Sequence, residues 1–384
     1  MKTKKLKVLL SALMVMLLAW TINSCSKSDV APVNFTSLTD AITTATTLLN
    51  GAVEGTATGD YTRGSKATLA AAITAAQAVV DNKASTSQQV TAAVAQLAAA
   101  VSTFQAAAVV PIDPTNLAGQ WTFDELTSAA AGTSVKDYSG NSFNGKITAG
   151  HPYFSTTPGL PWSGYTVTTN LPTQTADRYG DANKALHFTA GANVEIPYNA
   201  ALNPQQMSIS LWAKADSLPG DPAKYWANNY MISMNRWNGY KFQIQDTPRP
   251  FFTAHASGVN TPPLGNSSDS TYYDRDMNVG KITTLSKWHH YVVTFGGGHE
   301  VFYVDGFLVY DWNNVPGTIV NLSAKPVNLV IGQDLPTGKY STDSNSPYYV
   351  NYGAYFIGAI DEVRVYKSIL SATQVTSIYN LEKP

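Results

Sequence analysis

A sharp change of composition at residues 109–116 is the feature that most constrains the fold of this 384-residue chain. Before it, residues 34–108 are rich in Ala, Thr, Val and Leu and contain neither Trp nor Pro. After it come all the Trp residues except Trp20, and all the Tyr residues except Tyr61. Within the boundary, two prolines exclude a helix interior and favour an extended, semi-rigid linker. The chain is therefore expected to fold as two unlike domains joined at 109–116.

The first part has the spacing of amphipathic helices. Apolar residues recur there at steps of three and four, which lays one apolar stripe along each helix. The clearest series is Phe35, Leu38, Ile42, Ala45 and Leu49. Ser85 and Thr86 are followed three residues later by Gln88 and Gln89, which is typical of a capping box at the start of a helix. Residues 34–108 are predicted to form a small antiparallel three-helix bundle.

The second part, residues 117–384, has the pattern of a large antiparallel β-sandwich. Short strand-like runs alternate with clusters of Gly, Pro and Asn, and long helical periods are absent from the sequence. In one run, Phe302 and Val304 occupy alternate positions and Asp305-Gly306 follows, which is a strong hairpin signal. We therefore predict an all-β jelly-roll sandwich after the helical bundle.

The first 25 residues have the features of a lipoprotein signal. Four Lys residues precede an apolar run, Val8–Trp20, that is shorter than the ~20 residues of a membrane span. The segment ends at Cys25, the only cysteine, in a sequence that resembles a bacterial lipobox. We expect residues 1–24 to be removed, Cys25 to be lipidated and residues 25–33 to form a tether at the outer membrane, on the cell surface. An ordinary signal peptide with a chance cysteine is the alternative.

Motifs in both parts resemble known families. Residues 117–381 resemble the laminin-G-like, concanavalin A-like lectin domains in five separated motifs. They are Trp121–Gly145, Ala185–Pro197, Met207–Ala213, Trp288–Gly306 and Phe356–Tyr379. Gly59-Asp60-Tyr61 and the apolar positions after it resemble FIVAR-like helical modules of bacterial surface proteins, which serve mostly as spacers. The two resemblances together imply a glycan-handling surface lipoprotein.

The sandwich resemblance also implies a calcium ion that ties the first strand to the last. Asp124 follows the first expected strand and Asp361 begins the last one, and both carry oxygen donors of the kind that Ca2+ takes. Asp137 and Asn144 are further candidate ligands, although hydrogen-bonded turn roles explain these two equally well. A structural calcium site is therefore one of two interpretations of these residues.

Charge and acidic spacing exclude other functions. Lys and Arg number 25 against 26 Asp and Glu, so no basic surface for nucleic acid is expected. A glycosidase needs two carboxylates on one face, whereas adjacent pairs such as Asp361-Glu362 point to opposite faces of a strand. Asp274 and Asp276 are two apart, but we expect them in a polar loop. No enzymatic activity is predicted.

Aromatic residues flanked by Asn, Asp and Arg are the predicted ligand-binding groups. A sugar ring needs an apolar surface for its C–H face and directional partners for its hydroxyls. The predicted set is Trp226, Arg236, Trp237, Asn238, Tyr240 and Trp312. The predicted function is capture of a polysaccharide or other glycan by a monomeric surface lipoprotein. An adhesin that binds a protein partner is the alternative, and a glycoside hydrolase or lyase is a weaker one.

Two roles stay open for Trp237 at this point. Gly239 follows it and permits a turn that would hold the indole outward, beside Arg236 and Asn238. The same ring would instead belong to the core if the turn folds inward. These roles differ in what Trp237→Ala removes, which is binding in the first case and stability in the second.

Overall fold

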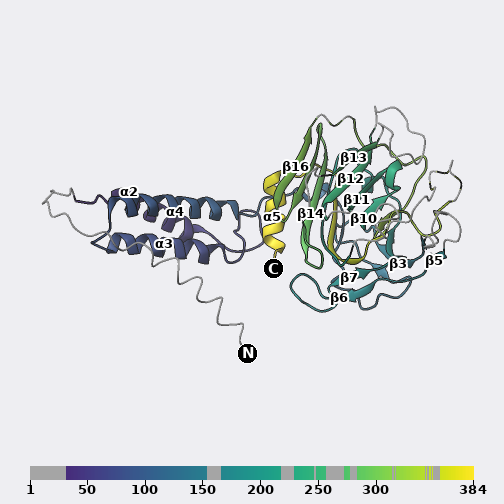
Figure 1. The fold of residues 1–384 in the computed structure, drawn as a ribbon, viewed down its shortest axis with the longest axis horizontal. Coiled ribbons are helices and arrows are strands. Elements are labelled where there is room, and N and C mark those ends of the chain that lie inside the picture. The colour runs from purple at the N-terminus through teal and green to yellow at the C-terminus, as the bar shows by residue number, and fades with distance from the viewer. Residues whose placement is uncertain are drawn as a thin grey trace.

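The computed structural model describes residues 32–153, 166–217, 229–245, 248–256, 272–276, 283–313, 315, 317–341, 343, 346, 348 and 355–384. Figure 1 shows helices at one end of the molecule and a two-sheet sandwich at the other. The predicted signal segment, Cys25 and Trp226 lie outside the described residues. Within the described ranges, no helix is long and apolar enough to span a membrane.

Three helices form the described part of the first domain. They are α2 (Thr36–Gly51), α3 (Ser65–Asp81) and α4 (Ser87–Ala106). Their apolar stripes meet in a core that includes the fully buried Leu38 and Leu69. The capping box predicted at the start of α4 is confirmed, because the amides of Gln89 and Thr86 each donate to the other's side chain. The three-helix bundle is therefore present as predicted.

Two antiparallel sheets form the second domain. The strands of the first sheet are β1 (Leu117–Trp121), β6 (Thr173–Thr175), β7 (Ala185–Phe188), β9 (Met207–Ala215), β14 (His289–Gly296), β15 (His299–Val304), β16 (Phe307–Asn313) and β18 (Gly358–Tyr366). They follow the order β16-β15-β14-β9-β18-β7-β6, and β1 also pairs with β18.

The second sheet lies against the first. Its strands are β2 (Ser134–Val135), β3 (Gly145–Ala149), β8 (Ala192–Ile196), β10 (Asn229–Met234), β11 (Tyr240–Ile244), β12 (Pro250–His255), β13 (Tyr272–Asp276) and β17 (Leu329–Ile331). They follow the order β13-β12-β11-β10-β17-β8-β3-β2. A short hairpin of β4 (His151–Tyr153) and β5 (Thr166–Thr168) is separate from both sheets. The predicted jelly-roll sandwich is confirmed.

The main core lies between the two sheets. Alternation decides which side chains enter it, because successive residues of a strand point to opposite faces. Ile209 and Leu211 of β9 are fully buried in this core, as the sequence pattern predicts. The rings of Phe252 on β12 and Phe295 on β14 lie 6.0 Å apart across the core, so the two sheets interlock directly.

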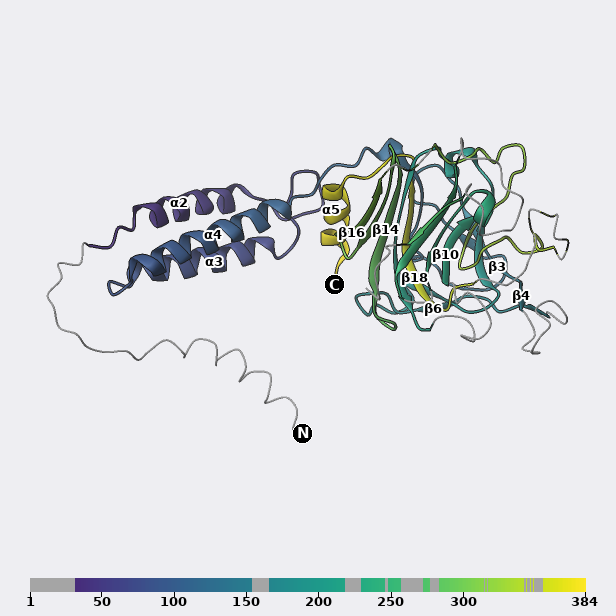
Figure 2. The same cartoon turned by 45° about the horizontal axis from the view of Figure 1, so that its top comes forward.

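A C-terminal helix, α5 (Ala372–Glu382), covers the outer face of the first sheet. Val375 and Ile378 pack there against Val292 and Tyr303 in a second, smaller core. Figures 1 and 2 both place α5 between the helical domain and the sandwich. The second sheet lies on the side of the sandwich away from the helices (Figure 1).

The segment between the domains is docked, whereas the sequence suggested a semi-rigid spacer. Val109 exchanges backbone hydrogen bonds with the 59–60 loop of the helical domain. On the other side, the side-chain amide of Gln374 on α5 donates to the carbonyl of Pro111 over 2.8 Å. A proline lacks an N–H but keeps its carbonyl acceptor, so the prolines of this segment still allow it to dock.

A β-bulge on β18 lies beside an ion pair between Glu362 and Arg364. The register between β18 and β9 shifts between Asp361 and Arg364, and Glu362 has a φ of 52°. Arg364 reaches Glu362 at 2.6 Å beside this bulge. Arg364 also meets Glu382 of α5 at 2.6 Å, which anchors the end of this helix to the sheet.

Candidate functional site

The predicted ligand-binding residues around Trp237 lie on a strained turn between β10 and β11. This turn is η3 (Arg236–Asn238), and both Asn235 and Arg236 have positive φ angles, 57° and 35°. The Arg236 guanidinium bonds Asp334 at 2.7 Å, and both side chains are buried. Ser233 supports the pair, because its hydroxyl donates to the Asp334 carbonyl and accepts from the Arg236 amide. The turn is therefore held by its own buried ion pair.

Trp237 and Tyr240 are both buried. Trp237 is 8% exposed, and the Arg236 guanidinium carbon lies 4.6 Å from its ring centre. Tyr240 is fully buried, and its hydroxyl donates to the Leu202 carbonyl over 2.7 Å. Gly239 serves close packing and not an outward turn, since a Cβ there would lie 2.2 Å from the Met234 oxygen. These placements agree with the core role that the sequence left open for Trp237.

Of the remaining predicted ligand-binding residues in the described part of the chain, Asn238 belongs to this turn and Trp312 does not. Trp312 is half-buried on β16 of the first sheet, with its ring 4.8 Å from that of Tyr310. Asn238 is on η3, where its carbonyl accepts from Nδ1 of His255 over 3.3 Å. The structure thus brings Arg236, Trp237 and Asn238 together and leaves Trp312 on the opposite sheet.

A row of polar side chains crosses the outer face of the second sheet beside η3. Lys241 and Gln243 of β11 are 2% and 0% exposed, and the Lys241 ammonium donates to Gln243 over 2.7 Å. The ammonium also lies 4.9 Å from the ring centre of Tyr230 and 4.7 Å from that of Phe251. The row is signalled in the sequence by the alternation of residues 240–245, but its burial makes it a support and not a contact surface.

The edge strand β13 corrects one expectation. Asp274 and Asp276 were expected in a polar loop, but both belong to β13. In the register with β12 they pair with Thr253 and Phe251. The two residues therefore belong to the second sheet, on the strand at its edge.

The outer face opens to solvent where the row reaches β8. Register pairs run from Lys241 through Ser233 and Val330 to Glu195, so these residues lie on neighbouring strands. A pocket of about 420 Å³ lies at this end. It is lined by Glu195, Tyr198, Pro326, Val327, Asn328, Pro336, Thr337 and Lys339. None of these residues was among those predicted from the sequence to bind a ligand.

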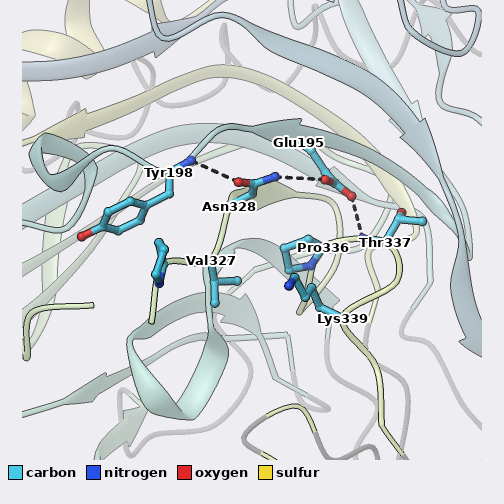
Figure 3. Close-up of a pocket in the computed structure, with 8 residues that line it drawn as sticks. Glu195, Tyr198, Val327, Asn328, Pro336, Thr337 and Lys339 are labelled. Atoms are coloured by element: carbon cyan, nitrogen blue, oxygen red, sulfur yellow. Dashed lines mark hydrogen bonds between the residues drawn. The ribbon is translucent and has the colours of Figure 1, made fainter. Parts of the chain in front are cut away.

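Hydrogen bonds fix the Glu195 carboxylate in this pocket. The Thr337 amide donates to one carboxylate oxygen over 2.6 Å, and the Asn328 side-chain amide donates to the other over 3.3 Å. The Asn328 oxygen in turn accepts from the Tyr198 amide over 3.1 Å. Figure 3 shows this chain of bonds, with the Tyr198 ring extending away from Glu195. Because each carboxylate oxygen can accept a second bond, Glu195 keeps acceptor capacity for a ligand.

Two of the predicted calcium ligands, Asp137 and Asn144, belong to one hydrogen-bonded turn, whereas Asp361 belongs to an ion pair. Both oxygens of Asp137 accept backbone amides, from Gln120, Ser139 and Phe143, and its own amide donates to Asn144. Asp361 pairs with Arg178 at 2.9 Å, and burial raises the pKa of Asp361 to about 8. Burial also raises the pKa of Asp124. In the parts of the chain that are described, no three His, Cys, Asp or Glu side chains are placed to hold a metal ion.

Family models match both domains. Residues 188–376 match the concanavalin A-like lectin/glucanases superfamily. The sandwich is a concanavalin A-like domain. Residues 34–105 match the FIVAR domain, so the helical bundle is a FIVAR module. No curated protein matches the chain.

Several solved structures are similar to the concanavalin A-like domain. Domain 4 of AbnA, a GH43 extracellular arabinanase from Geobacillus stearothermophilus in complex with arabinotriose, is 18% identical over 69% of this chain and 98% of its own, with a TM-score of 0.42. The binding domain of Paraclostridial Mosquitocidal Protein 1 is 13% identical over 69% of this chain and 52% of its own, with a TM-score of 0.41. A Trypanosoma rangeli sialidase is 12% identical over 71% of this chain and 33% of its own, with a TM-score of 0.39. The domain assignment rests on the family model and the two-sheet topology.

Proposed function

We propose that this protein is a surface lipoprotein that binds carbohydrate in the Glu195 pocket of its concanavalin A-like domain. The observation that carries the proposal is the fixed Glu195 carboxylate in a pocket that also offers a tyrosine and apolar side chains. Sugar hydroxyls donate to carboxylates, while the C–H face of a pyranose packs on flat apolar groups. Lys339 adds ammonium donors at the rim of the same pocket. Recognition without bond cleavage is the mechanism that we propose.

The domain arrangement supports a role at the cell surface. The helical module extends from the α5 side of the sandwich, while the pocket belongs to the second sheet on the far side (Figures 1 and 2). A lipid at Cys25 would hold the base of this assembly at the outer membrane, with the FIVAR module as a spacer. The pocket would then face away from the anchor.

A glycan array probed with residues 27–384 tests the proposal, followed by calorimetry of the best oligosaccharide with single variants. Glu195→Gln and Tyr198→Ala should each weaken binding about tenfold, because a charged hydrogen bond or a ring contact is worth ~1–3 kcal/mol. Glu54→Gln is the matched control, since its carboxylate also accepts a backbone amide, that of Lys66, but in the helical module. Binding that neither pocket variant changes would refute the site.

Protein adhesion is a second candidate, favoured by one observation. Phe307 and Leu308 at the start of the edge strand β16 are 71% and 54% exposed, and large apolar side chains exposed on an edge strand are of the kind that partners cover. Beads coated with the Phe307→Ser variant should then attach to host cells less than beads coated with the parent protein. Glycan binding by the variant should be unchanged. Attachment that survives this change would exclude this surface as an adhesin site.

A further inference from the structure

One lysine lines the Glu195 pocket, and two others are neighbours of its lining residues in the chain or in the sheet. Lys339 lines it, and Lys325 directly precedes the lining residue Pro326. Lys146 of β3 is the register partner of Glu195, on the adjacent strand and exposed on the same outer face. Paired residues on one face of a sheet have Cβ atoms about 5 Å apart, so this ammonium group is within reach of the pocket mouth. All three side chains are exposed.

The described residues around these ammonium groups do not neutralise them. Among the described residues, no carboxylate lies within ion-pair distance of Lys146, Lys325 or Lys339. Glu195 is the one acidic residue that lines the described pocket, and its carboxylate is held by Thr337 and Asn328. Three cations therefore meet one anion here, whereas the whole chain has slightly more acidic than basic residues.

Resting on the proposed function, we propose that the carbohydrate bound in this pocket is acidic and carries carboxylate or sulfate groups. The lysines at the rim meet the anionic groups of the ligand, and Glu195 accepts hydrogen bonds from its neutral hydroxyls. Exposed ammonium groups attract an anionic polymer over about a Debye length, so the preference for acidic ligands should weaken as salt is raised. Lys339 is partly positioned for this role, since its ammonium lies 5.7 Å from the ring centre of Tyr348.

Matched polymers test the charge requirement directly. Polygalacturonate is compared with its carboxyl-reduced form, and chondroitin sulfate with its desulfated form, by calorimetry with residues 27–384 at low and high salt. At least one acidic polymer should bind about tenfold more tightly than its neutral counterpart at low salt, and the pair that does so identifies the anionic group. Lys325→Gln/Lys339→Gln should remove most of this preference. Lys83→Gln/Lys287→Gln, an equal loss of charge at exposed sites outside the second sheet, should retain it.

The outcomes separate the two proposals. Equal or tighter binding of the neutral polymers overturns the requirement for acidic groups while carbohydrate binding stands. If Lys325→Gln/Lys339→Gln still prefers acidic polymers, the proposal is also overturned, because other residues would then bind the anionic groups. A protein that binds neither these polymers nor any glycan of the array contradicts the proposed function itself.

Discussion

The backbone amide of Val110 donates a hydrogen bond to the hydroxyl of Ser377 on α5, 3.0 Å away. The preceding residue, Val109, is bonded to the helical domain, where its amide donates to the carbonyl of Asp60 over 2.7 Å. Two consecutive residues are thus fixed to different domains, and no free chain separates them. Gln374 adds a further bond from α5 to this segment. The two domains should therefore move as one body.

A spin-label measurement tests this rigidity. Residues 27–384 contain no cysteine, so labels can be placed at the exposed positions Ala75 and Lys136. Pulsed dipolar spectroscopy should give a narrow distance distribution, which Ser377→Ala combined with Gln374→Ala broadens. Thr373→Ala on the exposed side of α5 should leave the distribution narrow. A broad distribution in the parent protein would show that the joint is flexible.

Trp237→Ala should destabilise the fold and not selectively impair binding. The indole is 8% exposed and lies against Arg236, so its removal should lower the free energy of unfolding by about 3 kcal/mol. Trp312→Ala is the comparison, because that ring is only half-buried and its loss should be smaller. Urea denaturation of both variants measures the difference. An unchanged stability together with lost glycan affinity would restore Trp237 as a ligand-binding residue.

The fold could be predicted from patterns of residues close together in the sequence. The Glu195 pocket depends instead on contacts between residues that are far apart in the sequence. The Thr86–Gln89 box and the alternation of Ile209 with Leu211 involve neighbours along the chain, so the sequence reveals them. Glu195 is held by Asn328 and Thr337, which lie more than a hundred residues away and meet it only when β8 pairs with β17. No local pattern signals such a contact.

The burial of Tyr240 could have been predicted from the alternation of its strand, but the prediction gave more weight to the clustering of aromatic residues around it. Tyr240 shares strand parity with Phe242 and Ile244, both buried in the core, while Lys241 and Gln243 take the other face. Strict alternation therefore predicts a core tyrosine. The count of nearby Asn and Arg residues favoured a ligand-binding role for it instead, and its burial corrects that choice.

His290 should make stability depend on pH. Burial lowers the pKa of its imidazole to about 4, and Nε2 pairs with the Ser210 hydroxyl at 2.8 Å. The unfolded chain takes up this proton near pH 6.5 but the folded chain only near pH 4, so stability present above pH 6.5 is lost as the pH falls. The difference in unfolding free energy between wild type and His290→Gln should shrink by about 3 kcal/mol from pH 7 to pH 4. A difference independent of pH would contradict the lowered pKa.

Asp137→Ala should destabilise the protein to the same extent with calcium and with a chelator. The change leaves the amides of Gln120, Ser139 and Phe143 without their carboxylate acceptor, a loss of about 3 kcal/mol. Thermal unfolding in the two conditions measures it. A loss that occurs only with calcium would show that Asp137 is a metal ligand. Calcium binding near Asp124 and Asp361 stays a prediction, which calorimetric titration of calcium into chelator-treated protein tests.

A crystal soak with the best oligosaccharide of the array shows directly whether sugar binds in the Glu195 pocket. We expect ligand density in the pocket, with a sugar hydroxyl within hydrogen-bond distance of the Glu195 carboxylate and a sugar ring near Tyr198. Glu195→Gln crystals soaked at the same concentration should show weaker density at this position. Clear density at another surface, such as Trp312 on β16, with this pocket free of sugar would contradict the account.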